Sequence, residues 1–291
     1  MQNLSTLREH MPMPDPSFPI KINPLQTWRM EVGATLFPHH WHEHMEFLYV
    51  VTGHATFECG SVPYECQAGD LIVVNSNELH YGISRSEDLS YYALIMDISL
   101  LNSPSSDAAD QKFITPMIEN RLLFQNYIEK DSSVTDCILA IRDELEVKNV
   151  GYELSVKAHL YRMLTLLVRR YVATVRERDE YYARLKELDR LAPVLAYIDD
   201  RYKEKLTVSE LADLAGLSRY HFSRLFKQVT DKSLVEYINL VRINKSESHL
   251  RDGRLTVSEI ALATGFSDIY YFSRMFKKLK GVSPSEWRSD V

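Results

Sequence analysis

The chain has 291 residues, a formal net charge of −6, 45% hydrophobic residues and 25% charged residues. This length suits two domains, and the composition is that of a folded globular protein, which excludes disordered and fibrous classes. The charge is uneven: residues 186–291 hold 18 Lys+Arg against 15 Asp+Glu (net +3), whereas residues 1–185 hold 16 against 25 (net −9). The C-terminal part is therefore the one suited to a nucleic-acid partner.

The cysteines Cys59, Cys66 and Cys137 show no metal-binding spacing, and their odd number predicts reduced thiols. No apolar run approaches the roughly 18 residues that span a bilayer. The N-terminus also lacks a basic stretch followed by an apolar run. We therefore expect a cytoplasmic protein with no membrane partner.

The N-terminal part reads as an extended arm followed by a β domain. Five prolines between Pro12 and Pro24 disfavour a helix there. From Trp28 to Ser99, short runs rich in Val, Ile, Tyr and Phe are separated by Gly and Asn, which predicts a small barrel or sandwich. The polar stretch 103–110 is the predicted edge of this domain.

Helical periodicity then continues to about residue 190. After Tyr152, apolar residues recur every seven positions, at Leu154, Tyr161, Val168 and Val175. Further apolar residues widen this stripe enough for both the domain's own core and a partner helix. We therefore predict a helical dimerisation region; packing on its own domain alone is the alternative.

One pattern is written twice in the last hundred residues. TVSELADLAGLSRYHFSRLFKQVT begins at Thr207, and TVSEIALATGFSDIYYFSRMFKK begins 49 residues later at Thr256. Each Thr-Val-Ser-Glu is a capping box, so helices are predicted to start at Val208 and Val257. The glycines at 216 and 265 end them, and the serines at 218 and 267 are predicted to cap a second helix. Each copy is therefore a helix-turn-helix, the unit whose second helix enters a DNA major groove.

Removing the apolar stripe from each second helix leaves the residues expected to face DNA. They are Arg219, Tyr220, Ser223, Arg224 and Lys227 in the first copy and Ile269, Tyr270, Ser273, Arg274 and Lys277 in the second. Arginine binds guanine with two hydrogen bonds, and apolar or aromatic groups meet the thymine methyl. The first copy is therefore expected to read DNA more by hydrogen bonds, and the second more by apolar contact. Phosphate contacts are expected from Lys227, Lys232, Arg242, Lys277, Lys278 and Arg288.

The segment between the copies, 233–250, has an apolar face that predicts one helix of roughly 27 Å. Adjacent major-groove openings on one face of DNA lie about 34 Å apart. A rigid helix of that length, with the offset of each motif, would place the two reading helices in successive grooves.

The segment GFSDIYYFSRMFKKLKGVSPSEWR, residues 265–288, resembles the signature of the AraC/XylS family of bacterial transcription regulators. The resemblance covers about residues 190–291. It implies a seven-helix DNA-binding domain whose base contacts fall on Tyr220, Ser223 and Arg224, and on residues 269, 270, 273 and 274. Ile269 and Tyr270 depart from the polar residues usual at those positions.

The β domain contains one segment loaded with imidazoles, FPHHWHEHMEFLYVVTG. In an extended strand, residues 40, 42, 44, 46, 48 and 50 share one face. Together with GDLIVVNSNELHYG, this segment resembles the paired motifs of the cupin barrel, whose metal ligands would fall on His40, His42, Glu46 and His80. The second motif departs from the cupin pattern at Asn75 and Asn77, where proline and glycine are usual, and in the missing asparagine after the last histidine.

Three roles remain open for this cluster. In a metal-free effector pocket the four residues form hydrogen bonds while Trp41 and Tyr81, or Tyr91, form apolar walls; a neutral polyol such as a sugar suits this mixture. The alternatives are a bound metal ion and a set of satisfied polar groups without a ligand. The first role needs neither cofactor nor metal.

The expected fold class is α+β. We predict a cupin-like ligand-sensing barrel with an N-terminal arm (1–105), a helical dimerisation or linker region (106–185) and a DNA-binding domain with two helix-turn-helix motifs (186–291). The predicted function is a non-enzymatic transcription regulator controlled by a small molecule. Its expected partners are promoter DNA, a second copy of the chain, and RNA polymerase if it activates. The alternative is a metal-dependent cupin enzyme fused to a DNA-binding domain.

Overall fold

The computed structural model describes residues 8–9, 11–25, 32–60, 62–102, 107–230 and 232–289. By its contacts the chain divides into two compact units. The N-terminal unit comprises residues 10–34 and 41–182, and the C-terminal unit comprises residues 1–9, 35–40 and 183–291. Within the described ranges, none of the helices has the length and apolar character that crossing a membrane requires.

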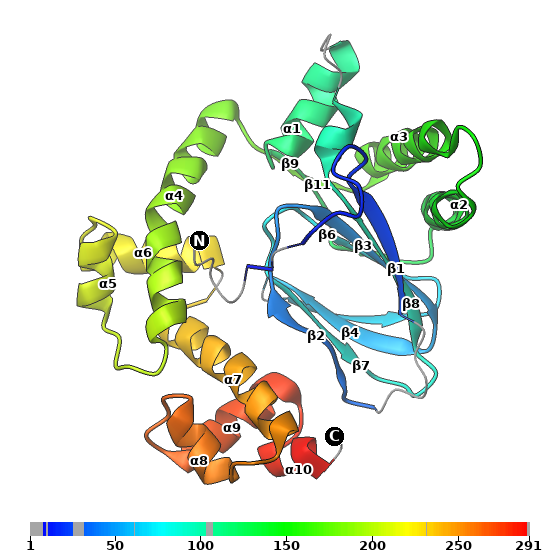
Figure 1. The fold of residues 1–291 in the computed structure, drawn as a ribbon. Helices are drawn as coiled ribbons and strands as arrows, with labels where there is room; N and C mark the ends of the chain where they lie inside the picture. Colours follow the sequence, from blue (N-terminus) through cyan, green and yellow to red (C-terminus); the bar gives the residue numbers. More distant parts are fainter. Residues whose placement is uncertain are drawn as a thin grey trace. The chain divides into compact units, whose positions relative to one another are not determined.

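Two antiparallel sheets build the β part of the N-terminal unit (Figure 1). The first has the strand order β1 (Ile20–Leu25), β8 (Ser90–Met96), β3 (Met45–Thr52), β6 (Leu71–Val74) and β10 (Tyr127–Ile128). In the second, β4 (His54–Cys59) lies between β7 (His80–Ser84) and β5 (Val62–Gln67). Strand β2 (Thr35–His40) belongs by its contacts to the C-terminal unit.

The first sheet has two different faces. Glu46 lies opposite Ile95, whereas the next residue, Phe47, lies opposite Leu94. Because side chains alternate along a strand, the face that carries Phe47 joins the main apolar core, and the face that carries Glu46 is its reverse. On this reverse face Tyr91 makes an edge-to-face ring contact with a phenylalanine of β4. The Glu46 face is therefore turned toward the second sheet, inside the barrel.

Two helices, α2 (Ser132–Val147) and α3 (Tyr152–Arg170), complete the core on the Phe47 face. They are preceded by η1 (Ile98–Leu101), η2 (Asp110–Ile114), α1 (Thr115–Ile118) and β9 (Leu122–Phe124), and followed by β11 (Val172–Val175). Buried residues of the two helices, including Ile138, Ile141, Leu160 and Leu164, pack in this core. The predicted continuous helical region is therefore wrong at β9, β10 and β11, where short strand pairing takes over.

Only some of the apolar residues that recur every seven positions from Leu154 onward pack in the core. Leu154 and Tyr161 are 76% and 41% exposed, and Val168 packs partly against the core. Val175 lies beyond the end of the helix, in β11. The buried line runs instead through other positions of α3, so the expected stripe marks largely its outer side.

The seven helices that the family resemblance implied follow β11 in the described part of the chain, and all of them except the start of α4 lie in the C-terminal unit (Figure 1). They are α4 (Arg178–Arg201), α5 (Val208–Leu214), α6 (Arg219–Thr230), α7 (Leu234–Asp252), α8 (Val257–Ala263), α9 (Ile269–Lys280) and α10 (Pro284–Ser289). The predicted starts at Val208 and Val257 are confirmed, because Thr207 and Thr256 each accept a hydrogen bond from the third helical residue. The α+β fold class is confirmed.

The two reading helices, α6 and α9, start differently. Ser218 Oγ accepts from the amide of His221 at 3.3 Å, as expected for the first copy. In the second copy Asp268, not Ser267, is the cap, and its carboxylate accepts from the amide of Tyr270 at 2.8 Å. The predicted cap at Ser267 is wrong because the second copy has one more residue in its turn, which moves the cap by one position.

The turn before α9 requires glycine. Gly265 has φ +89°, in the left-handed region, and a Cβ built there would lie 2.7 Å from the Cα of Lys203. Any side chain would therefore meet both backbone strain and a clash with backbone atoms.

Helix α7 joins the two motifs as one helix, as predicted. It starts at a full capping box formed by Ser233 and Glu236. Near its C-terminal end Glu247 forms a buried ion pair with Lys280, the last residue of α9. Lys280 is fully buried and also donates to Asn244 Oδ1 at 3.2 Å. Two buried charged groups therefore hold α9 against α7.

Removing one partner of this pair leaves an uncompensated buried charge, which costs about 3–5 kcal/mol. Lys280→Met should therefore lower the stability of the C-terminal unit by about that amount and speed hydrogen exchange in α7 and α9. The exposed Lys277→Met is the matched control and should change stability by less than about 0.5 kcal/mol. Equal effects of the two variants would show that the buried pair contributes nothing.

Asp131 ties the start of α2 to the end of α3. Its carboxylate accepts from the amide of Ser133 at 3.1 Å, from Arg170 Nη1 at 2.8 Å and from the Tyr171 hydroxyl at 2.8 Å. Burial opposes ionisation, but the hydrogen bonds from these three residues outweigh it and lower the pKa of Asp131 to about 2. The ionised carboxylate therefore stabilises the folded state.

Because the folded-state pKa lies below the ordinary 3.8, this stabilisation is present above pH 4 and is lost as the pH falls from about 4 to about 2. Asp131→Asn should cost on the order of 1 kcal/mol at pH 7 and progressively less below pH 4. Urea unfolding at several pH values, assigned by hydrogen exchange in α2 and α3, measures this. Asp143→Asn, at an exposed carboxylate, is the control; a pH-independent difference for Asp131→Asn would contradict the assignment.

Candidate functional site

Helix α6 presents one apolar and one polar face. Phe222, Leu225 and Phe226 are buried. The five residues expected to face DNA in this copy are all exposed: Arg219, Tyr220, Ser223, Arg224 and Lys227. Arg219 also donates from Nε to Ser209 Oγ of α5 at 3.1 Å, which ties the start of α6 to the first helix of its motif.

Helix α9 repeats this design with one difference. Phe272 and Phe276 are fully buried, Tyr270 is 79% exposed, and Arg274 and Lys277 are exposed. Ser273 is half-buried. Ile269 is half-buried as well and packs against the core of this motif, so the outward position expected for it is wrong for most of its side chain.

The two arginines stand at equivalent positions. Arg224 follows Phe222 by two residues, as Arg274 follows Phe272. Because each phenylalanine is buried, an arginine two positions further along the helix lies on a different face, toward solvent. Both motifs therefore offer a guanidinium at the same point of the reading helix, where a bidentate contact to guanine is the strongest specific option.

Two of the six basic residues expected at phosphates have structural roles instead. Arg242 is half-buried; it donates to the Tyr202 carbonyl at 2.7 Å and to the Glu204 carbonyl at 2.8 Å. Arg288 donates to the Leu255 carbonyl. Lys227, Lys277 and Lys278 are exposed, and Lys232 is half-buried. Sequence position alone could not separate the two groups, because the carbonyl partners lie in distant loops.

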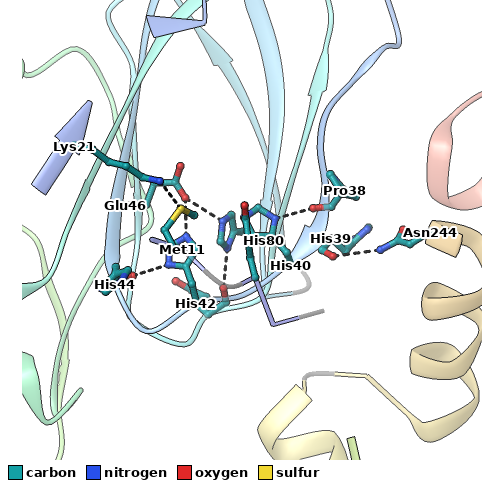
Figure 2. Close-up of polar contacts among 12 residues, drawn as sticks. Met11, Lys21, Pro38, His39, His40, His42, His44, Glu46, His80 and Asn244 are labelled. Atoms are coloured by element: carbon teal, nitrogen blue, oxygen red, sulfur yellow. Dashed lines mark hydrogen bonds and ion pairs between the residues drawn. The ribbon is translucent and has the colours of Figure 1, made fainter. Parts of the chain in front are cut away.

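Inside the barrel, three of the predicted cluster residues meet (Figure 2). Glu46 Oε2 lies 3.2 Å from His42 Nε2 and 3.0 Å from His80 Nε2. The ligand atoms of these three residues lie within 4.8 Å of one another, and all three side chains are buried. They come from three places in the chain: the segment before β3, β3 itself and the start of β7.

Backbone carbonyls fix both rings. His42 Nδ1 donates to the His44 carbonyl at 3.1 Å, and His80 Nδ1 donates to the Glu78 carbonyl at 2.8 Å. A carbonyl only accepts, so each Nδ1 carries the proton and each Nε2 is directed at the carboxylate. Nε2 either donates to Glu46, when the ring is protonated, or offers a lone pair beside it. The second state is the arrangement of an imidazole ready to bind a metal ion.

The carboxylate is held in its charged form. Burial opposes ionisation of Glu46, but the hydrogen bonds and the charges of His42 and His80 outweigh it and lower its pKa. Tyr91 shares this face of the sheet, and its buried hydroxyl has no hydrogen-bond partner among the described residues. Burial and the nearby charge of Glu46 raise the pKa of Tyr91, so the phenol stays protonated as a hydrogen-bond donor.

Two further predicted sensor residues lie at the end of β2 and just after it. His40 is buried at the end of β2; its Nδ1 donates to the Pro38 carbonyl at 2.8 Å and its Nε2 pairs with Glu9 at 2.9 Å. His40 as a further ligand stays a prediction. Trp41 is half-buried in the link to β3. The single continuous strand expected around the histidines is wrong, since β3 starts only at Met45.

Tyr81 lies on the face opposite His80. His80 pairs across the sheet with Cys59 and Tyr81 with Glu58, and successive residues of a strand point to opposite sides. The expectation that Tyr81 shares a wall with His80 is therefore wrong. Phe57, whose ring lies 5.7 Å from that of Tyr91, was missed as a wall residue. Its place two residues before Cys59 in a strand was the only signal for it.

Two family models match the chain. The model for an AraC-like ligand binding domain matches residues 33–164, and the model for a helix-turn-helix domain matches residues 211–290. The first contains His42, Glu46 and His80, and the second contains both reading helices.

Relatives of the same kind match over nearly the whole chain. An uncharacterized HTH-type transcriptional regulator, YdeC of Bacillus subtilis, is 23% identical over 291 residues, which is 99% of this chain and 96% of YdeC. The HTH-type transcriptional activator RhaS of Escherichia fergusonii is 25% identical over 271 residues, which is 89% of this chain and 90% of RhaS.

Among solved structures, ToxT from Vibrio cholerae superposes with a TM-score of 0.50 and 17% identity, covering 93% of this chain and 98% of ToxT. At that identity the likeness shows the fold alone. The matched ligand-binding and helix-turn-helix models, with relatives that extend across both, show that the chain belongs to the AraC family of transcriptional regulators.

Proposed function

We propose that this regulator binds promoter DNA through α6 and α9 and that a small molecule held inside the barrel of the N-terminal unit controls the binding. The observation that carries the DNA part is the pair of exposed arginines, Arg224 and Arg274, at equivalent positions on two separately seated helices. A single exposed arginine is common on a protein surface. Two in the same register of a repeated motif indicate a repeated task.

The two reading helices differ in the rest of their surface. Around Arg224 the first helix offers further polar groups, whereas beside Arg274 the second offers Tyr270 and withdraws most of Ile269 into its core. The operator should therefore be asymmetric. Hydrogen-bonded specificity concentrates in the half read by α6, and the aromatic ring of α9 supplies an apolar contact, for which the thymine methyl is the partner.

For the effector, a neutral polyol such as a sugar suits the barrel interior. Glu46 accepts hydrogen bonds, the Tyr91 hydroxyl donates one, and Phe57 and the Tyr91 ring supply apolar surface. The exposed Leu154 and Tyr161 of α3 offer a surface for a second copy of the chain. Promoter binding in the cytoplasm, with contact to RNA polymerase if the protein activates, completes the proposal.

The second candidate is a metal ion in the barrel. Two imidazoles whose Nδ1 atoms are fixed by carbonyls, with a shared carboxylate, are the donor set that Fe(II), Mn(II) or Zn(II) accepts. His42, His80 and Glu46 would hold the ion, and it would supply Lewis-acid or redox chemistry when bound. This observation also supports the alternative of a metal-dependent cupin enzyme joined to a DNA-binding unit.

Replacing either arginine should remove base contacts but leave phosphate contacts. Arg224→Ala and Arg274→Ala should each weaken binding to a footprinted operator by roughly 5- to 150-fold, and binding to unrelated DNA far less, because a bidentate guanine contact is worth about 1–3 kcal/mol. Lys227→Ala is the matched control and should weaken both kinds of DNA alike. Gel shifts that show equal losses on both DNAs for the arginine variants would overturn their role.

Metal and polyol are separated by two measurements on the full chain. If the barrel holds a metal, protein purified without chelator contains it stoichiometrically and His42→Ala loses it. If it holds a polyol, a sugar screen raises the melting temperature of the wild type, and Tyr91→Phe reduces that shift, since only the folded state binds. Metal retained in His42→Ala would exclude the cluster as its site, and a sugar shift unchanged in Tyr91→Phe would exclude the phenol as a donor.

A further inference from the structure

The C-terminal unit contains a short chain of polar contacts that ends at the second reading helix. It starts at the carbonyl of His39 in β2, which accepts from Asn244 Nδ2 of α7 at 3.2 Å (Figure 2). The Oδ1 atom of the same amide accepts from Lys280 Nζ at 3.2 Å. Lys280 closes α9 and is fully buried. One amide therefore joins strand β2 to the end of a reading helix.

The orientation of this amide is dictated by its neighbours. Lys280 has three donors and no acceptor, so the oxygen of Asn244 must face it. The NH₂ group is then left for the His39 carbonyl, which can only accept. Glu247, about one turn further along α7, forms an ion pair with the ammonium group of Lys280. Rotating the amide by half a turn would place donor against donor and acceptor against acceptor, so the two contacts are made or lost together.

Strand β2 is also the direct continuation of the sensor segment. His39 is followed by His40, Trp41 and His42, and His42 is held by Glu46 inside the barrel. Three peptide units thus separate His39, whose carbonyl accepts a hydrogen bond from α7, from His42 in the buried cluster. A ligand that changes the position of His42 therefore acts within three residues of the carbonyl that Asn244 binds, a stretch that can span at most about 10 Å.

We propose that Asn244 is a positioning residue for the second reading helix, and that it transmits the state of the barrel cluster to α9 through the His39 carbonyl. This rests on the proposed function, whose regulated step it specifies. A change in the cluster shifts β2, the Asn244 amide moves with the His39 carbonyl, and Lys280 keeps or loses its hydrogen bond to Asn244 Oδ1. The end of α9 is then held or loosened, while the base-reading residues near its start are carried with it.

Asn244→Asp isolates the link. The carboxylate keeps an acceptor for Lys280, so α9 stays anchored, but it has no donor for the His39 carbonyl and repels it. Asn244→Leu removes both contacts and serves as the comparison in which α9 also loses its anchor. The barrel is perturbed separately by Glu46→Gln, which removes the charge between the two imidazoles. His42→Gln is a second perturbation should Glu46→Gln fold poorly.

The test is a double-mutant cycle on the full chain, read by hydrogen exchange of α9 amides and by affinity for a footprinted operator. In the wild-type background, Glu46→Gln should change α9 exchange and operator affinity by about 5-fold or more, the lower end of ordinary allosteric coupling. In the Asn244→Asp background the same substitution should change neither, although the exchange of α9 in Asn244→Asp alone stays near that of the wild type.

Equal effects of Glu46→Gln in both backgrounds, or none on α9 in the wild type, would overturn the proposal. Because the exchange readout needs no DNA, a failure of operator binding would count against the proposed function, whereas uncoupled exchange with intact operator binding would count against Asn244 alone.

Discussion

Burial of paired phenylalanines is the constraint on which the DNA-facing surface depends. Phe222 and Phe226 in α6, and Phe272 and Phe276 in α9, are fully buried. Burying one such side chain is worth about 1.5–3 kcal/mol, far more than any preference of an exposed polar group. Each helix therefore has one permitted rotation about its axis. The arginines reach solvent as a consequence of which face the phenylalanines occupy.

Burial of the phenylalanines sets the rotation of each reading helix, and the residues that cap the helices set where each helix begins. Thr207 and Thr256 cap α5 and α8 in the same way, so the first helix of each motif begins at the same point of the repeat. The second helices then diverge, because Asp268 takes the role that Ser218 has in the first copy. The two reading helices are therefore rotated about their axes in the same way, although the turns before them differ. As a result, α6 and α9 share one arrangement but expose different side chains.

The N-terminal unit is organised around a different constraint, the buried carboxylate of Glu46. A buried charge is tolerated only when it is paired, and Glu46 is paired twice. On the same face, the Tyr91 hydroxyl has no hydrogen-bond partner within the part of the chain that the structure describes. A barrel with a fixed anion and an unused donor has the polar groups that a small molecule needs, whereas a purely structural core would give the buried phenol a partner as well.

How far sequence reasoning reached depends on the range of the interactions concerned. Local patterns were sufficient for the caps at Thr207 and Thr256, of which Thr256 forms the full capping box while Thr207 makes only the bond from the Glu210 amide. They were also sufficient for the turn glycines and for the alternation that places Glu46 inside the barrel. They were insufficient where a distant backbone decides the outcome. Arg242 donates to backbone carbonyls some forty residues earlier in the chain, and Lys280 is buried in an ion pair with Glu247 on another helix. Periodicity alone also could not reveal β9 and β11, which are strands only because they pair with each other.

Hydroxyl-radical footprinting of the full chain on a selected operator tests the central claim most directly. If both motifs read DNA across the single helix α7, the footprint should show two protected patches on one face, about one helical turn apart. Arg224→Ala should then erase one patch and Arg274→Ala the other. A single protected patch, or two patches that respond identically to either substitution, would contradict the account.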